Sequence, residues 1–307
     1  MGIMKKYKPL ILALRPNQWV KNLILFTAII FTGKLFDSNL FFATFAGFII
    51  FSALSSASYL FNDIMDLSYD KLHPEKKKRP LAAGLIPVNS AIETAFILAF
   101  FGLIAALFVN VIFFFIAVLF VLLHIVYTLF LKKRAVLDIL GISFSFMLRA
   151  FAGEAITGYH LPYWMTLTIL FLSLFIAAAK RHAELIREGD KTRPALHQYR
   201  EHLLDAYTSV FATATVITYS LFTYFEEPIK FNEPIRSLLT NLAPKAIDRK
   251  WMMIGIPFVL YGLMRYAQLL YERNEGEAPE KIVTTDKPLI VSMALWGIST
   301  ILILYVL

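Results

Sequence analysis

Long apolar runs recur along the whole of this 307-residue sequence, and each is long enough to cross about 30 Å of hydrocarbon as an α-helix. Hydrophobic residues make up 58% of the chain and charged residues 17%, whereas soluble domains carry about 25% charged residues. No stretch is large and polar enough to form a separate soluble domain. The sequence therefore predicts an all-α, polytopic membrane protein with a single domain over residues 1–307.

Nine runs qualify as transmembrane helices. Their expected bounds are 20–36, 40–60, 91–108, 111–129, 136–157, 163–183, 206–225, 252–270 and 289–306. An earlier apolar run follows Lys5, Lys6 and Lys8, but Arg15 interrupts it. That run is too short to be a cleaved signal peptide.

Basic residues indicate how the chain is oriented. With the amino terminus inside, most Lys and Arg residues fall on the inside connections, as cytoplasmic loops of membrane proteins require. The net charge of +8 is thus explained by topology, and no soluble basic module suggests nucleic-acid binding. Cysteine is absent, which excludes disulfides and thiolate metal sites. The polar clusters also lie on the inside, so we expect a multi-pass protein with a cytoplasmic active face.

One acidic motif follows the second apolar run. Asn62, Asp63, Asp66 and Asp70 form the pattern N-D-x-x-D-x-x-x-D. If one helix continues through the motif, the three carboxylates share a face, because a helical turn takes 3.6 residues. Clustered carboxylates bind Mg²⁺, which keeps coordination positions open for phosphate oxygens. The motif predicts Mg²⁺–diphosphate binding; the alternative is a solvated helix end whose acids pair with the basic run 76–79.

Polar and basic side chains near the first two runs are candidates for contacts to phosphate. Charge-assisted hydrogen bonds from Arg and Lys suit phosphate oxygens, although interfacial anchors have a similar composition. The candidates before the first run are Arg15, Gln18, Lys21 and Asn22, and those after the acidic motif are Lys78 and Arg79.

The start of the fifth run carries another polar set. Tyr127, Arg134 and Asp138 lie near the inside boundary, where an Arg134–Asp138 salt bridge on one helix is the structural alternative. Arg149 follows Asp138 by eleven residues, almost three turns, and so shares its face about 16 Å away. An arginine deep in a membrane span requires a partner or a substrate, so Arg149 is a candidate site residue. Glu154 is its expected partner if Gly153 distorts the helix.

The sixth run ends in Lys180, Arg181 and Glu184, below small residues that leave room for a ligand. A surface ladder of ion pairs would have the same pattern. His182 is expected to be a packed histidine, because no second histidine keeps ligand spacing with it.

These motifs together resemble the UbiA superfamily of intramembrane prenyltransferases, which have nine helices and an Asn-Asp-x-x-Asp-x-x-x-Asp motif. Most members carry a second aspartate-rich motif after the sixth helix, where this chain has residues 180–185, Lys-Arg-His-Ala-Glu-Leu. It is instead similar to the decaprenyl-phosphate phosphoribosyltransferase branch. The motifs that carry this likeness are residues 15–22, 137–139, 148–153 and 180–185.

The resemblance implies nine helices around a central cavity, with 5-phosphoribosyl 1-diphosphate as donor, a polyprenyl phosphate lipid as acceptor, and Mg²⁺ as cofactor. It also implies location in the plasma membrane and a product that feeds cell-envelope arabinan precursors; a homo-oligomer is compatible with it. Asp63 and Asp66 would bind Mg²⁺, and Asp70 a metal-bound water or a ribose hydroxyl. The expected phosphate contacts are Lys21, Arg134, Lys180 and Arg181, and the expected remaining pocket residues are Asp138, Arg149 and Glu184.

Two other functions remain open. A UbiA-type enzyme could transfer a prenyl group from a prenyl diphosphate to an aromatic or polar acceptor, although the missing second aspartate motif argues against it. A transporter could use Arg149 in a permeation path, but repeated halves with discontinuous helices are not apparent.

Overall fold

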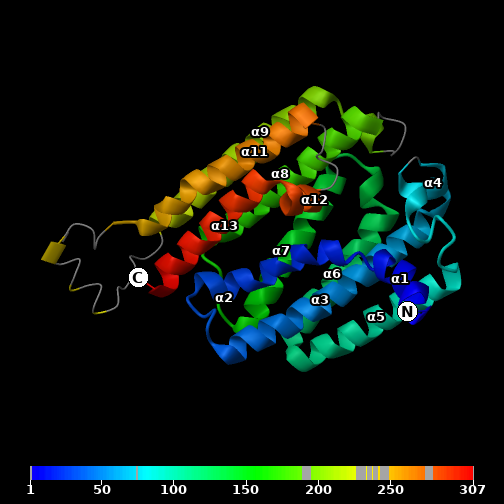
Figure 1. The fold of residues 1–307 in the computed structure, drawn as a ribbon, viewed down its shortest axis with the longest axis horizontal. Helices are drawn as coiled ribbons and strands as arrows, with labels where there is room; N and C mark the ends of the chain where they lie inside the picture. The colour runs from blue at the N-terminus through cyan, green and yellow to red at the C-terminus, as the bar shows by residue number, and fades with distance from the viewer. Residues whose placement is uncertain are drawn as a thin grey trace. The chain divides into compact units, whose positions relative to one another are not determined.

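The protein was analysed as a computed structural model, which describes residues 2–73, 75–188, 195–225, 249–273 and 279–306, with 233, 237, 241 and 242. The chain divides into two compact units (Figure 1). Unit 1 comprises residues 1–29, 35–159 and 190–198, and unit 2 comprises residues 30–34, 160–189 and 199–307. The single domain over residues 1–307 stays a prediction.

All the regular secondary structure among the described residues of unit 1 is helical. Its elements are α1 (Gly2–Ala13), η1 (Pro16–Phe26), α3 (Ser38–Met65), α4 (Leu67–Leu72), η2 (Lys76–Lys78), α5 (Val88–Val109), α6 (Val111–Leu129), η3 (Leu131–Lys133), α7 (Leu137–Thr157) and η5 (Leu196–Gln198). The short α2 (Thr27–Phe31) is divided between the two units. Helix α3 packs against α5, α6, α7 and η1, and the side-by-side course of α3 and α5 is visible in Figure 1. A buried cluster that includes Leu25, Phe51, Phe113 and Ala152 joins these helices.

Polar caps define where two of these helices begin. The carboxylate of Asp37 accepts hydrogen bonds from the backbone N–H groups of Asn39 and Leu40 at the start of α3. The side chain of Asn110 accepts one from Phe113 N at the start of α6. Such caps satisfy backbone donors that have no partner within the first helical turn. They explain why the long apolar runs separate into distinct helices.

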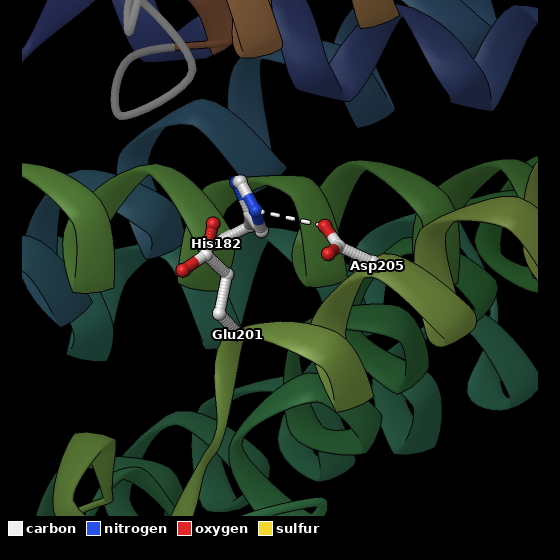
Figure 2. A group of neighbouring side chains, drawn as sticks. All are labelled: His182, Glu201 and Asp205. Carbon is white, nitrogen blue, oxygen red and sulfur yellow. Dashed lines mark ion pairs between the residues drawn. The ribbon is translucent and has the colours of Figure 1, made fainter.

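Unit 2 contains α8 (Tyr163–Glu188), α9 (Glu201–Phe225), η7 (Trp251–Gly255), α11 (Ile256–Arg273), α12 (Pro279–Thr285), α13 (Lys287–Ile301) and the π-helical η8 (Leu302–Val306). Helices α8 and α9 pack along one another, and α11 contacts both. Near the end of α8, His182 faces Asp205 of α9 (Figure 2). A buried cluster including Phe175, Leu263 and Leu270 holds α8 and α11 together.

Seven helices among the described residues are long and apolar enough to cross a membrane. Large apolar side chains are exposed on them, for example Phe96, Phe101 and Phe108 of α5, as expected of a surface that faces lipid. The chain is therefore an integral membrane protein. The expected number of nine spans is not confirmed. The first expected span begins in η1 and continues into the five-residue α2, and the 25-residue α9 is less apolar because Thr, Ser and Tyr residues interrupt it.

Candidate active site

The acidic motif lies at a break between two helices. Helix α3 ends at Met65, Asp66 has φ −96° and ψ 4°, and α4 begins at Leu67. The expectation that one helix continues through the motif is therefore wrong. Asp66 pairs with Lys132, whereas Asp63 and Asp70 share Arg79.

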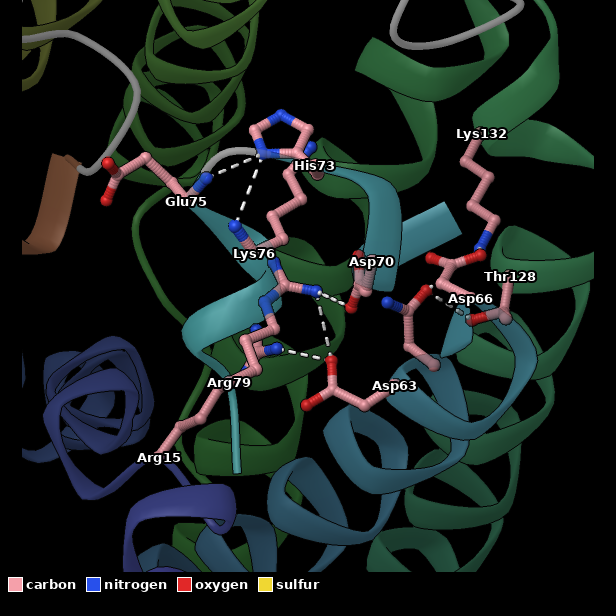
Figure 3. Close-up of polar contacts among 11 residues, drawn as sticks. Arg15, Asp63, Asp66, Asp70, His73, Glu75, Lys76, Arg79, Thr128 and Lys132 are labelled. Carbon is pink, nitrogen blue, oxygen red and sulfur yellow. Dashed lines mark hydrogen bonds and ion pairs between the residues drawn. The ribbon is translucent and has the colours of Figure 1, made fainter. Parts of the chain in front are cut away.

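Two arginines bind the outer carboxylates of the motif (Figure 3). Arg79 Nη1 lies 3.2 Å from Asp63 Oδ1 and 2.6 Å from Asp70 Oδ2, so one guanidinium joins both acids. Arg15 Nη2 lies 2.5 Å from Asp63 Oδ1. Arg15 has a left-handed backbone with φ 53°, a conformation that costs a non-glycine residue free energy and is often found at functional sites.

A lysine binds the central carboxylate. Lys132 Nζ lies 2.6 Å from Asp66 Oδ1 and donates to Asn62 Oδ1 at 3.1 Å. Thr128 Oγ1 donates to the same amide oxygen at 3.4 Å. Lys132 is buried, and so its charge is opposed by Asp66 with little screening by water. We call Arg15, Asn62, Asp63, Asp66, Asp70, Arg79 and Lys132 the acid–base cluster.

Burial changes the acidity of one member of the cluster. The Asp70 side chain is only 6% exposed, and this burial raises the pKa of its carboxyl. The Arg79 guanidinium opposes that rise in pKa, while the neighbouring charges of Asp63 and Asp66 add to it. A buried carboxyl that is held above its usual pKa gains from further positive charge. The cluster can therefore accept a cation as well as an anion.

A second polar group surrounds Arg149 in the middle of unit 1. The Arg149 side chain is 2% exposed, its Nε donates to Asn22 Oδ1 at 2.7 Å, and its Nη1 donates to Ser145 Oγ at 2.5 Å. Its Nη2 donates to Ser55 Oγ at 3.4 Å, and its guanidinium lies 4.7 Å from the centre of the Phe120 ring. All these acceptors are neutral. A buried guanidinium held in this way favours an anion nearby.

Gly153 permits the close approach that brings Asn22 to Arg149. A Cβ at Gly153 would lie 2.2 Å from the carbonyl oxygen of Leu25 in η1. Helix α7 runs without interruption through this position. Gly153 therefore sets the contact between η1 and α7. The expectation that it distorts the helix to pair Arg149 with Glu154 is wrong, since Arg149 donates to Asn22, Ser55 and Ser145.

The other expected residues of unit 1 differ in burial. Lys78 is exposed and pairs with Glu75 at 3.0 Å. Arg134 is exposed and precedes α7, so the expected placement of Arg134 and Asp138 on one helix is wrong. Asp138 is fully buried in the first turn of α7. The remaining residues are half-buried: Gln18 and Lys21 in η1, and Tyr127 in α6, whose ring packs against Gly141.

Lys180, Arg181 and Glu184 belong to unit 2, on α8. Arg181 and Glu184 are buried, and the Arg181 guanidinium contacts the Glu184 carboxylate. This buried pair differs from the surface ladder that was the alternative expectation. Lys180 is half-buried on the same helix.

Sequence reasoning missed Lys132 and the serines around Arg149. Lys132 belongs to a basic run of three residues, and the sequence gives no reason to choose it over its neighbours. Ser52 and Ser55 occupy the small-residue stretch before the acidic motif, and both hydrogen-bond with Asn22. A regular spacing of serines in an apolar helix is the signal that could have identified them.

Comparison with known proteins identifies a matching family and two relatives that share one name. The profile of the UbiA prenyltransferase family matches residues 23–298. The decaprenyl-phosphate phosphoribosyltransferase of Corynebacterium glutamicum is 32% identical over 306 residues, which cover 97% of this chain and 87% of the relative. The enzyme of that name from Mycolicibacterium smegmatis is 33% identical over 295 residues, covering 94% of this chain and 89% of the relative.

A solved structure has a similar fold. A UbiA homologue from Archaeoglobus fulgidus, bound to GPP and Mg²⁺, superimposes with a TM-score of 0.69 at 20% sequence identity. The match covers 97% of this chain and 99% of that chain. At this identity the likeness concerns the fold.

Proposed function

Because this chain belongs to the UbiA prenyltransferase family, we propose that it transfers a phosphoribosyl group from 5-phosphoribosyl 1-diphosphate to a polyprenyl phosphate, releasing pyrophosphate. The observation that carries the donor and acceptor is the 32–33% identity, over nearly the whole chain, to two decaprenyl-phosphate phosphoribosyltransferases. The acid–base cluster and the buried Arg149 support a substrate rich in phosphate.

The cluster fits Mg²⁺ by the chemistry of its donors. Asp63, Asp66, Asp70 and Asn62 offer oxygen ligands, which this hard cation prefers. In the structure these oxygens are bound to Arg15, Arg79 and Lys132 instead. We propose that, on binding of a diphosphate with its metal, Arg15, Arg79 and Lys132 would turn to the phosphate oxygens and Asp63 and Asp66 would hold Mg²⁺. When bound, Mg²⁺ neutralises charge on the diphosphate leaving group.

The side chains of this protein then have separate tasks. Breaking the bond between C1 of the ribose and the diphosphate oxygen leaves negative charge on the pyrophosphate, which Arg15, Arg79 and Lys132 stabilise. Asp70 is proposed to contact a ribose hydroxyl or a metal-bound water. The acceptor phosphate is already anionic at neutral pH, so it needs to be positioned against C1 more than it needs a general base. Lys21, Arg134, Lys180 and Arg181 are proposed to contact donor phosphates, and Asp138, Arg149 and Glu184 to line the pocket.

The proposed reaction is tested by product formation. Purified protein receives 5-phosphoribosyl 1-diphosphate labelled in the ribose, together with a polyprenyl phosphate, and labelled lipid is measured with Mg²⁺ and with excess chelator. We expect lipid labelling with Mg²⁺ and none with chelator. Absence of labelling in active, folded protein would reject the donor or the acceptor.

A prenyltransferase is the second candidate, because a fold relative was solved with GPP and Mg²⁺. In that case the same cluster would bind a prenyl diphosphate. A parallel reaction with labelled prenyl diphosphate and an aromatic acceptor separates the two functions. Turnover of the prenyl diphosphate without phosphoribosyl transfer would favour this alternative.

The Arg149→Met variant separates a functional arginine from a structural one. Methionine keeps most of the volume and removes a buried charge, but it also leaves acceptors on Asn22, Ser55 and Ser145 without their donor, which costs about 1–3 kcal/mol for an unsatisfied buried group. We expect folded protein with a modestly lower melting temperature, and phosphoribosyl transfer lowered about 100-fold or more, as when one charge-stabilising donor is lost. A lower melting temperature with normal specific activity would contradict the role of Arg149 in substrate binding.

We further propose that the protein lies in the plasma membrane with the acid–base cluster facing the cytoplasm. The excess of Lys and Arg on that face supports this orientation. A soluble phosphoribosyl donor would then reach the site from the cytoplasm, and the acceptor lipid from the bilayer. Labelling of single cysteines introduced into this cysteine-free chain would test the orientation directly.

A further inference from the structure

A compact group of metal-binding side chains lies in unit 2, separate from the residues assigned above. His182 of α8 meets Glu201 and Asp205, which are four residues apart on one face of α9 (Figure 2). One ligand atom from each residue lies within 4.8 Å of those from the other two. Among the described residues of the chain, no other three His, Asp or Glu side chains place their ligand atoms within 4.8 Å of one another.

The histidine is the unusual member of the group. His182 is 3% exposed, and its Nε2 lies 2.9 Å from Asp205 Oδ1. Within the described part of the chain, neither of its ring nitrogens has an acceptor or donor in hydrogen-bonding geometry. A buried imidazole nitrogen without a hydrogen bond costs free energy. Coordination of a metal ion between His182 and Asp205 would satisfy Nε2.

The neighbours of the group hold its ligands in place. Tyr271 of α11 donates a hydrogen bond to Asp205 Oδ1 at 3.0 Å, and its ring lies 4.8 Å from the His182 ring. Thr208 Oγ1 is 2.9 Å from the Tyr271 hydroxyl. Such contacts orient ligating side chains around metals. Glu201 is exposed, so an ion can enter from solvent.

We infer that His182, Glu201 and Asp205 bind a divalent first-row transition-metal ion, of which Zn²⁺ is the best probe. Imidazole nitrogen and carboxylate oxygen are both zinc ligands, and water could complete the coordination. With bonds of about 2.0–2.1 Å, two ligand atoms on a tetrahedral ion lie roughly 3.3 Å apart, close to the observed His182–Asp205 separation. Mg²⁺ and Ca²⁺ prefer oxygen ligands alone, which argues against them here.

The ion would act as a cross-link in unit 2. Its ligands lie near the end of α8 and in the first two turns of α9, and Tyr271 adds α11 to the assembly. Binding of an ion to the folded state alone would stabilise the protein against unfolding. This inference does not depend on the proposed function, because none of the three ligands belongs to the proposed substrate site.

The test is direct measurement of zinc on the full-length protein, purified without a histidine tag. After dialysis against Zn²⁺ with millimolar Mg²⁺ present to occupy oxygen-only sites, we expect one tightly bound zinc per chain by elemental analysis. At constant Mg²⁺ concentration, zinc should also raise the melting temperature by several degrees. Retention of no zinc by folded protein would overturn the inference.

Matched variants show where the zinc is bound. Glu201→Gln changes an exposed side chain and should fold normally, yet weaken zinc binding at least about tenfold, and His182→Gln should abolish it. His202→Ala, at an exposed histidine next to Glu201, is the control and should bind zinc as the parent does. Equal zinc binding by the parent and Glu201→Gln proteins would assign the ion to another site and reject the inference.

Discussion

Asp63→Asn should lower phosphoribosyl transfer by about 100- to 1,000-fold, the loss expected when one element of transition-state charge stabilisation is removed. Asp63 is 3% exposed and is the carboxylate that both Arg15 and Arg79 contact. Asparagine has the same shape but cannot balance two guanidinium groups or hold Mg²⁺ with a full charge. The measurement is the initial rate of lipid labelling as a function of Mg²⁺ concentration. The Mg²⁺ concentration that gives half of the maximal rate should be higher in the variant.

Glu75→Gln is the matched control for that experiment. Glu75 is an acid on the connection between α4 and η2, and it is exposed and pairs with the exposed Lys78. Exposed pairs contribute little to stability. The control should keep the parent rate and Mg²⁺ dependence. Parent activity in Asp63→Asn would falsify the proposed role of the acid–base cluster.

Gly153→Ala should destabilise the protein by about 3 kcal/mol, at or beyond the upper end of the usual cost of overpacking. The added Cβ would lie 2.2 Å from the oxygen, 3.0 Å from the carbonyl carbon and 3.1 Å from the Cα of Leu25. These are backbone atoms, so no side-chain rotation relieves the clash, and η1 must move away from α7. That movement would also separate Asn22 from Arg149, so transfer should fall with stability.

Gly297→Ala is the control for this substitution. Gly297 also lies within a helix, α13, but a Cβ there would meet no atom within 4 Å. Alanine favours a helix by up to about 1 kcal/mol relative to glycine, so this variant should unfold at the parent temperature or slightly above it. Intrinsic fluorescence during heating of the detergent-purified proteins measures the melting temperatures of both variants. Similar melting temperatures for the two variants would contradict the close approach at Gly153.

Local patterns predicted the helices well where apolar runs are bounded by caps. The expected span 111–129 coincides with α6 (Val111–Leu129), and 91–108 lies within α5 (Val88–Val109). The first expected span differs, because apolar composition does not distinguish an α-helix from the 3₁₀ conformation of η1. Hydrophobicity indicates which segments lie in the membrane, whereas backbone conformation also depends on tertiary contacts.

The spacing of the acids indicated that they lie together, and the alternative that they pair with the basic run 76–79 is confirmed for Arg79, whereas the distant partners Arg15 and Lys132 were not predicted. Asp63 contacts Arg15, which precedes it by 48 residues, and Asp66 contacts Lys132, which follows it by 66. No periodicity within one helix predicts such pairs, because they depend on how helices pack. The break at Asp66 was missed for a related reason: the sequence there has no proline or glycine to mark it.

The 3₁₀ conformation of η1 has a consequence for length. A 3₁₀-helix rises about 2.0 Å per residue and an α-helix about 1.5 Å, so the 11 residues of η1 and the 5 of α2 can extend to about 30 Å. That is the thickness of the hydrocarbon layer. Sixteen residues thus reach as far as twenty do in an ordinary spanning helix. Rewinding η1 as an α-helix would shorten it by about 5.5 Å, one full turn, and would draw Asn22 out of register with Arg149.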